Sequence, residues 1–124
     1  MHKILIVEDH ADIRRLIRMT LEFESVEIHE AADAEAGLAK AQDLRPDLVL
    51  LDVMMPGPLD GLALCRALRA DPAMAKVPVV MLSALGHAAD RQAGLAAGAT
   101  AYLVKPFSPM QLLELTTSML GTTV

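Results

Sequence analysis

Reactive side chains stand at the ends of several short apolar runs of this chain. These runs are followed at once by a carboxylate, a hydroxyl or an amine: Glu8, Asp9, Asp52, Ser83 and Lys105. Carboxylates that gather in one place bind a hard divalent cation such as Mg²⁺ through their oxygens. Together with such a cation, a hydroxyl and a lysine they can hold a phosphoryl group, because its transfer needs mainly in-line positioning and charge neutralisation. In this chemistry Asp52 is the candidate nucleophile.

Taken one at a time, these side chains also have structural explanations. A carboxylate after a strand is often a helix cap or a solvated loop residue. Lys105 stands before Pro106, which suits an exposed turn, since lysine is usually at the surface. The functional hypothesis therefore depends on their joint occurrence after four apolar runs. Three carboxylates packed together would also raise one another's pKa values unless a cation lay among them.

The run that ends in Asp52 shows how such a residue is positioned. Its apolar part, Leu48–Leu51, is too short for a helix and lacks alternation, which is typical of a strand covered on both faces in a parallel sheet. The following segment, Met54–Pro58, contains two prolines and a glycine and cannot continue the strand. We therefore expect Asp52 at the carboxyl end of its strand, where open α/β sheets bind ligands.

Strand and helix patterns alternate along the whole chain. The predicted strands are Lys3–Val7, Val26–Glu30, Asp47–Asp52, Val77–Leu82 and Ala101–Val104. The predicted helices are one around Ile13 that runs to about Glu24, then Ala34–Leu44, Gly61–Ala70, His87–Ala97 and Pro109–Gly121. This alternation predicts an α/β fold in which helices cover both faces of a parallel sheet. The carboxyl ends of its strands would bring the five reactive side chains to one edge.

Composition narrows the class of protein. A chain of 124 residues, 53% of them hydrophobic, is one domain by size with ample material for a core. No signal peptide or run of about 20 apolar residues is present, so we expect a cytoplasmic protein without a membrane span. The single cysteine, Cys65, predicts a buried thiol rather than a disulfide or a metal site. The net charge of -5 argues against direct nucleic-acid binding.

The motifs around these residues resemble the receiver domain of two-component response regulators over residues 2–120. The matching segments are Ile4–Asp9, Leu50–Pro56, Asp60-Gly61, Met81–Ala84, Gly98-Ala99 and Tyr102–Phe107. The resemblance implies a flavodoxin-like, doubly wound, five-stranded parallel sheet of order 2-1-3-4-5 with five helices. It also implies a phosphoprotein that is no enzyme beyond its own phosphorylation and dephosphorylation.

The resemblance assigns a role to each site residue. Asp52 would accept a phosphoryl group from a phosphohistidine on a sensor histidine kinase or histidine phosphotransfer protein. Mg²⁺ would be held by Glu8, Asp9, Asp52 and the backbone carbonyl of Met54. The phosphoryl oxygens would contact Lys105 and Ser83.

A change of surface would carry the signal in such a domain. Contact with the phosphoryl group would pull the Ser83 loop inward, and Tyr102 would follow it and alter the face made by the fourth helix, fifth strand and fifth helix. Phosphorylation adds about -1.5 to -2 charges, enough to bias a two-state surface. That face would bind a downstream protein or effector domain. The alternative role for Tyr102 is a ring at the rim of the core.

Two departures from the family pattern stand out. The segment from Asp52 to Gly61 is one residue longer than is usual, with the extra residue in Gly57–Leu59, which leaves the place of Asp60 and the effect of the extra residue open. No Lys or Arg follows Lys105, so we expect a monomer or weak dimer rather than a dimer held by charge pairs. His10 follows Asp9 and could touch the metal, but we interpret it as a solvated loop residue.

Alternative readings concern the extent of the protein and its class. The sequence is read as one receiver, residues 1–124 with a core over 2–120, and no effector domain. The same sequence suits a fragment of a larger response regulator or hybrid histidine kinase. A flavodoxin-like or phosphatase-like enzyme is less well supported, because the acidic segment Glu8–Asp12 would repel a phosphate that lacked a metal.

Overall fold

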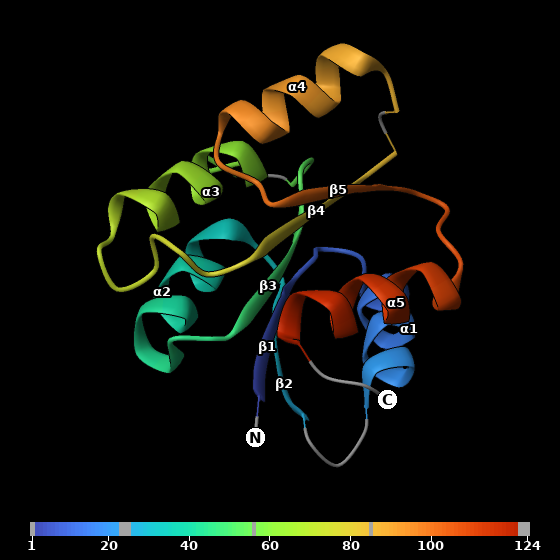
Figure 1. The fold of residues 1–124 in the computed structure, drawn as a ribbon. Coiled ribbons are helices and arrows are strands. Elements are labelled where there is room, and N and C mark those ends of the chain that lie inside the picture. The colour runs from blue at the N-terminus through green and yellow to red at the C-terminus, as the bar shows by residue number, and fades with distance from the viewer. Residues whose placement is uncertain (1, 23–25, 56, 85, 122–124) are drawn as a thin grey trace.

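Strands and helices alternate through the computed structural model, which describes residues 2–22, 26–55, 57–84 and 86–121. The strands are β1 His2–Val7, β2 Val26–Ala31, β3 Leu48–Asp52, β4 Val79–Ser83 and β5 Ala101–Val104. The helices are α1 Ala11–Leu21, α2 Ala34–Leu44, α3 Gly61–Ala70, α4 Ala88–Ala96 and α5 Pro109–Leu120. Figure 1 shows the sheet running through the middle of the molecule with helices on either side.

The strands form one parallel sheet in the order β2-β1-β3-β4-β5. The chain starts in the centre with β1, moves outward to β2, and then crosses back to build β3, β4 and β5 on the other side. The predicted α/β class and the strand order 2-1-3-4-5 are confirmed. The register pairs Val7 with Leu51 and Asp52 with Leu82, so neighbouring strands end together.

Alternate residues of each central strand enter two separate cores, one on each face of the sheet. On one face Leu5, Val49 and Met81 pack with residues of α2 and α3. On the other, Ile4 and Leu50 pack with residues of α1 and α5, the two helices that lie side by side in Figure 1. This is why β1, β3 and β4 are apolar without alternation: both faces of each strand are buried.

Local signals place most of the helix ends where the sequence predicts them. Asp33, Asp60 and Ser108 each accept a hydrogen bond from a backbone amide in the first turn of α2, α3 and α5. Gly98 follows α4 with φ +105°, a left-handed conformation that favours glycine. The three N-caps set where α2, α3 and α5 begin, and hence where the loops that lead into them lie.

Most element bounds lie within one residue of the prediction, and two differ by more. β4 begins at Val79 instead of Val77 because the Val77 amide donates to the Met74 carbonyl, which keeps Val77 in the preceding turn. α1 ends at Leu21, and Glu22 is already extended. The predicted helix end at Glu24 lies outside the described residues.

None of the helices in the described ranges is long and apolar enough to cross a membrane. Cys65 is buried in α3, as predicted.

Candidate functional site

The ends of four strands bring the reactive side chains to one edge of the sheet. Asp52 and Ser83 are the last residues of β3 and β4, while Glu8 and Lys105 follow β1 and β5. Backbone hydrogen bonds continue past the strands: the Glu8 amide donates to the Ala31 carbonyl and the Lys105 amide to the Ser83 carbonyl. The loops at this edge therefore start in fixed positions.

Lys105 joins two carboxylates that are distant in the sequence. Its Nζ lies 2.6 Å from Glu8 Oε1 and 3.3 Å from Asp52 Oδ1. The side chain of Glu8 is 0% exposed and that of Asp52 is 4% exposed, so both carboxylates are withdrawn from water. The predicted convergence of Glu8, Asp52 and Lys105 is confirmed as geometry.

The close packing of the acidic side chains shifts the pKa values of Asp52 and Asp9 in opposite directions. Burial and then the charge of Glu8 raise the pKa of Asp52 to about 7, against the opposing charge of Lys105. For Asp9, burial acts in the same direction, but hydrogen bonds with Glu8 and Asp52 and the charge of His10 outweigh it and lower the pKa. The expectation that the carboxylates raise one another's pKa values is therefore confirmed for Asp52 and wrong for Asp9, because hydrogen bonds with Glu8 and Asp52, helped by the charge of His10, stabilise the ionised form of Asp9.

His10 belongs to this cluster, which the sequence interpretation did not expect. Its side chain is 63% exposed, as a loop residue would be, yet its Nδ1 lies 3.1 Å from Glu8 Oε2 and 3.2 Å from Asp9 Oδ1. The hydrogen bond to Glu8 and the charge of Asp9 raise the pKa of the imidazole. The sequence signal was its position next to Asp9, which alone does not say which way the ring points.

Arg14 is a further residue that sequence reasoning missed. One of its terminal nitrogens donates to the carbonyl oxygens of Glu8, at 2.8 Å, and of Asp9, at 3.3 Å, while Nε donates to Glu30 at 3.2 Å. It thereby ties the acidic loop to α1 and β2. The pattern of α1 showed Arg14 only as one of several polar residues between apolar ones, with no sign of this inward contact.

The lengthened segment after Asp52 still delivers α3 against the site. Asp60 accepts from the Ala63 amide at 2.8 Å, so the structure places this carboxylate as the N-cap of α3. At Gly61 a Cβ atom would lie 2.3 Å from the carbonyl oxygen of Asp52, which is too close for any other residue. The beginning of α3 thus packs directly on the backbone of the candidate nucleophile.

The remaining predicted residues occupy distinct positions around this edge. Ser83 is buried at the end of β4, and the Met54 side chain is 61% exposed. The Met54 amide donates to Asp52 Oδ1 at 3.4 Å. Tyr102 lies on β5, half-buried, with the Arg91 guanidinium of α4 5.8 Å from its ring centre.

The oxygens of the site suit a hard cation. Ligand atoms of Glu8, Asp9, His10 and Asp52 all lie within 4.8 Å of one another. Asp9 Oδ1 is a buried oxygen that meets no hydrogen-bond criterion within the described part of the chain, although His10 Nδ1 is near it. A buried carboxylate oxygen left in this way is what a bound cation satisfies. The donor set therefore fits Mg²⁺.

Comparison with known families identifies this arrangement. The sequence model of the response regulator receiver domain matches residues 4–117. The chain belongs to this family. It is thus a receiver domain of two-component signalling, a class whose members act as phosphoacceptors rather than as classical enzymes and work with a histidine kinase. An acidic cluster such as Glu8, Asp9 and Asp52 is typical of the Mg²⁺ site of receivers.

Individual relatives agree with this assignment. The receiver is 47% identical over 110 residues to the transcriptional regulatory protein ResD of Bacillus subtilis (strain 168), a match that covers 89% of this chain and 44% of ResD. It is 39% identical over 123 residues to the DNA-binding dual master transcriptional regulator RpaA of Synechocystis sp., covering 99% of this chain and 51% of RpaA. The chain thus spans about half the length of these curated relatives.

A solved structure matches nearly the whole receiver. Chemotaxis protein CheY4 of Vibrio cholerae shares 37% sequence identity and superposes with a TM-score of 0.89, covering 96% of this chain and 98% of that chain.

Proposed function

We propose that this receiver takes a phosphoryl group from a phosphohistidine onto Asp52, with the help of Mg²⁺, and passes the signal on through a protein contact. The donor would be a sensor histidine kinase or a histidine phosphotransfer protein. The observation that carries the proposal is the position of Lys105, whose Nζ lies within 3.3 Å of Asp52 and 2.6 Å of Glu8 although these residues come from three separate strand ends. A lysine held beside a buried carboxylate can neutralise phosphoryl oxygens that arrive there.

In the proposed transfer an Asp52 oxygen attacks phosphorus as the bond to the donor imidazole breaks. The new bond is an acyl phosphate oxygen–phosphorus bond, and the imidazole nitrogen leaves with the electron pair of the old bond. Attack requires the ionised carboxylate, while burial and Glu8 hold the pKa of Asp52 at about 7. Lys105 already opposes that shift, and further positive charge at the site would favour the reactive form.

Mg²⁺ would supply that charge and would neutralise the phosphoryl oxygens as the transfer proceeds. Glu8, Asp9, Asp52 and the backbone carbonyl of Met54 would hold it. The buried Asp9 Oδ1, which accepts no hydrogen bond from the described residues, supports this assignment. The contact of Lys105 with Glu8 would then loosen, which leaves its Nζ available to the phosphoryl group.

Ser83 and Tyr102 would transmit the change. Ser83 ends β4 and pairs in register with Val104, so a movement of its loop toward the phosphoryl group would act on β5 next to Tyr102. The Tyr102 ring contacts Gly94 of α4, where even a Cβ atom would lie 3.0 Å from it. A shift of this ring would therefore alter how α4 packs on β5. The face made by α4, β5 and α5 would then bind a downstream protein or effector domain rather than nucleic acid.

Labelling with a small phosphodonor tests the proposed acceptor. Incubation with acetyl phosphate and Mg²⁺ should add one phosphoryl group to the wild-type protein and none to Asp52→Asn. Intact-protein mass spectrometry measures the addition. Asp47→Asn is the matched control, because Asp47 stands at the opposite end of the same strand run and should leave labelling unchanged. Equal labelling of Asp52→Asn and wild type would refute the acceptor assignment.

A further inference from the structure

The imidazole of His10 faces the acidic site and does not cap helix α1. His10 is the N-cap of α1, where a side chain commonly accepts a hydrogen bond from the first turn, yet its ring makes no such bond. Instead Nδ1 lies 3.1 Å from Glu8 Oε2 and 3.2 Å from Asp9 Oδ1. An imidazole nitrogen that could bind a metal is thus present among the carboxylate oxygens of the site.

These separations match those between neighbouring ligands of one metal ion. In an octahedral site with bonds of about 2.1 Å, adjacent ligand atoms lie about 3.0 Å apart. His10 Nδ1 has this spacing to both carboxylate oxygens, and the ligand atoms of Glu8, Asp9, His10 and Asp52 share a region within 4.8 Å. A cation seated among them would replace the close approach of Nδ1 to the oxygens by bonds to each.

Hydrogen bonds hold the backbone that carries the ring. The His10 amide donates to Glu8 Oε2 at 3.1 Å, and its carbonyl accepts from the Arg14 amide at 3.0 Å, the first bond of α1. Arg14 in turn holds the carbonyls of Glu8 and Asp9. The ring therefore starts from a fixed backbone, and a ligand so placed loses little freedom when a metal binds.

We infer that His10 Nδ1 is a metal ligand of this receiver. Relative to Mg²⁺, the site therefore binds first-row transition cations such as Ni²⁺ and Co²⁺ more tightly than a site made only of oxygen ligands would. Imidazole suits these ions, whose affinity for nitrogen ligands rises along the series, whereas Mg²⁺ gains little from nitrogen. The inference rests on the proposed function in one respect, namely that Glu8, Asp9 and Asp52 hold a divalent cation. His10 would set which cations compete for that place.

Titration calorimetry of the untagged protein tests this with NiCl₂ and MgCl₂ at one pH and ionic strength. His10→Phe keeps a ring but removes the nitrogens, and it should weaken Ni²⁺ binding by about ten-fold or more while changing Mg²⁺ binding by less than about two-fold. His87→Phe is the matched control, because His87 is the exposed N-cap of α4 and also makes no side-chain cap bond. It should bind both ions as the wild type does.

A spectroscopic measurement reports on the ligand itself. The visible absorption of bound Co²⁺ should change between the wild type and His10→Phe and stay the same in His87→Phe. His10→Gln repeats the test if the phenyl ring disturbs the loop. Ni²⁺ binding that is equal in the wild type and both His10 variants, or a wild type that binds no Ni²⁺ at the site, would overturn the inference.

Asp9→Asn distinguishes a failure of the His10 inference from a failure of the proposed cation site. If this variant loses Mg²⁺ binding while the His10 variants keep Ni²⁺ binding, the cation site stands and only the role of His10 fails. If Asp9→Asn binds Mg²⁺ as the wild type does, the cation does not lie among these carboxylates and the proposed site itself is wrong.

Discussion

At each end of the sheet one long cationic side chain links several elements, but the groups that receive it differ. At the amino end Arg69 of α3 donates to the carbonyl oxygens of Gly98 at 2.8 Å and Val77 at 2.6 Å, and to the Thr100 hydroxyl at 3.2 Å. At the carboxyl end Lys105 meets the carboxylates of Glu8 and Asp52. Neutral oxygens receive the first cation and crowded anions the second.

The acceptors of Arg69 do not titrate and are fixed by the backbone. It also reaches the carbonyls of Met74 and Ala75, and thereby closes the loops before β4 and β5. The hydrogen bonds of Arg69 use neutral, fixed acceptors, so this group of residues needs no bound ion to balance its charge. This is the pattern of a residue that serves stability.

At the carboxyl end of the sheet, in contrast, the negative charges are not fully balanced. Lys105 is shared between buried Glu8 and Asp52, the pKa of Asp52 is raised to about 7, and Asp9 Oδ1 lacks a hydrogen-bond partner among the described residues. Charge that is left unbalanced in this way costs stability until a cation binds. The comparison teaches that shortage of positive charge, rather than the mere presence of charged residues, marks the functional end of this fold.

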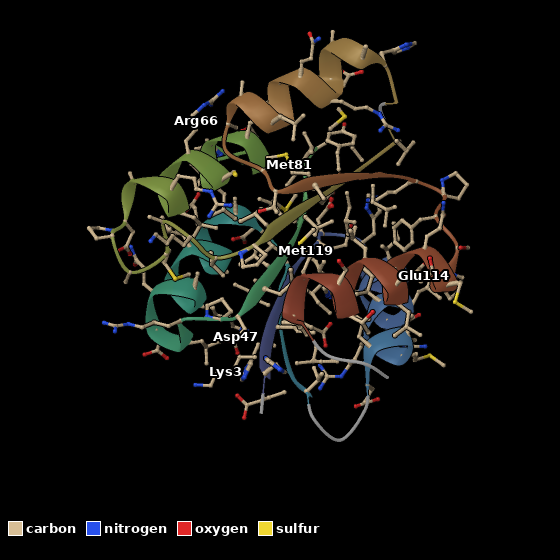
Figure 2. The ribbon with its side chains drawn as sticks, viewed as in Figure 1. Lys3, Asp47, Arg66, Met81, Glu114 and Met119 are labelled. Carbon is tan, nitrogen blue, oxygen red and sulfur yellow. The ribbon has the colours of Figure 1, made fainter. Side chains whose placement is uncertain are left out.

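Removal of Arg69 should cause the largest loss of stability. Arg69→Met keeps the apolar stem but leaves the carbonyls of two loops without their donor, so we expect a loss of about 3 kcal/mol in the free energy of unfolding. Urea denaturation followed by circular dichroism measures it. Arg66→Met is the control, since Arg66 is exposed on the same helix and points away from the sheet in Figure 2. A similar loss in both variants would mean that the hydrogen bonds of Arg69 do not stabilise the amino end.

Removal of the Asp52 charge should instead increase the stability of the protein. The pKa of Asp52 is raised from 3.8 to about 7 in the folded protein. The free energy of unfolding therefore falls progressively as the pH rises between these two values. Without added metal, Asp52→Asn should therefore be more stable than the wild type by about 4 kcal/mol at pH 8, and the difference should vanish below about pH 4. Urea titrations at several pH values measure the change.

The two ends of β3 supply the control for that experiment. Asp47 precedes the strand, is exposed, and accepts from the Lys3 amide at 2.7 Å; Figure 2 shows the two residues together at the amino edge. Asp47→Asn should change stability by less than about 0.5 kcal/mol at every pH. If Asp52→Asn behaves in the same way, the carboxyl end is not short of positive charge.

Addition of Mg²⁺ should give the smallest of these effects. At a concentration ten times its Kd the ion should stabilise the wild type by about 1.4 kcal/mol, because it binds the folded carboxylates and not the unfolded chain. Thermal unfolding with and without MgCl₂ at pH 8 measures the shift. Asp9→Asn should lose the stabilisation and Asp47→Asn should keep it, and a shift of equal size in both would point to a general salt effect.

The fold was largely predictable from the chain alone. The non-alternating runs of β1, β3 and β4 predicted strands buried on both faces, and the two cores confirm this. The strand order came from the family resemblance, because crossover patterns alone do not choose among orders. The start of β4 was missed because it depends on the Val77 turn, whose carbonyl Arg69 also holds.

The residue types of the candidate site were also visible in advance, but their electrostatic differences were not. A count of carboxylates treats Asp9 and Asp52 alike. Their pKa values move in opposite directions because Asp52 is buried beside Glu8, while hydrogen bonds with Glu8 and Asp52 and the nearby His10 stabilise the ionised form of Asp9. Arg14 and His10 escaped for the same reason, since the direction of a side chain at the start of a helix depends on what surrounds it.

The sequence by itself determined the approximate extent of the strands and helices, and the presence of an acid, a hydroxyl or an amine after four of the predicted strands, since these follow from local patterns of apolarity and turn chemistry. Only the tertiary structure decided that Lys105 reaches both Glu8 and Asp52 and that His10 turns toward the carboxylates. Distances between residues as far apart in the chain as Glu8 and Lys105 are set by sheet register and packing, and the resulting burial controls charge.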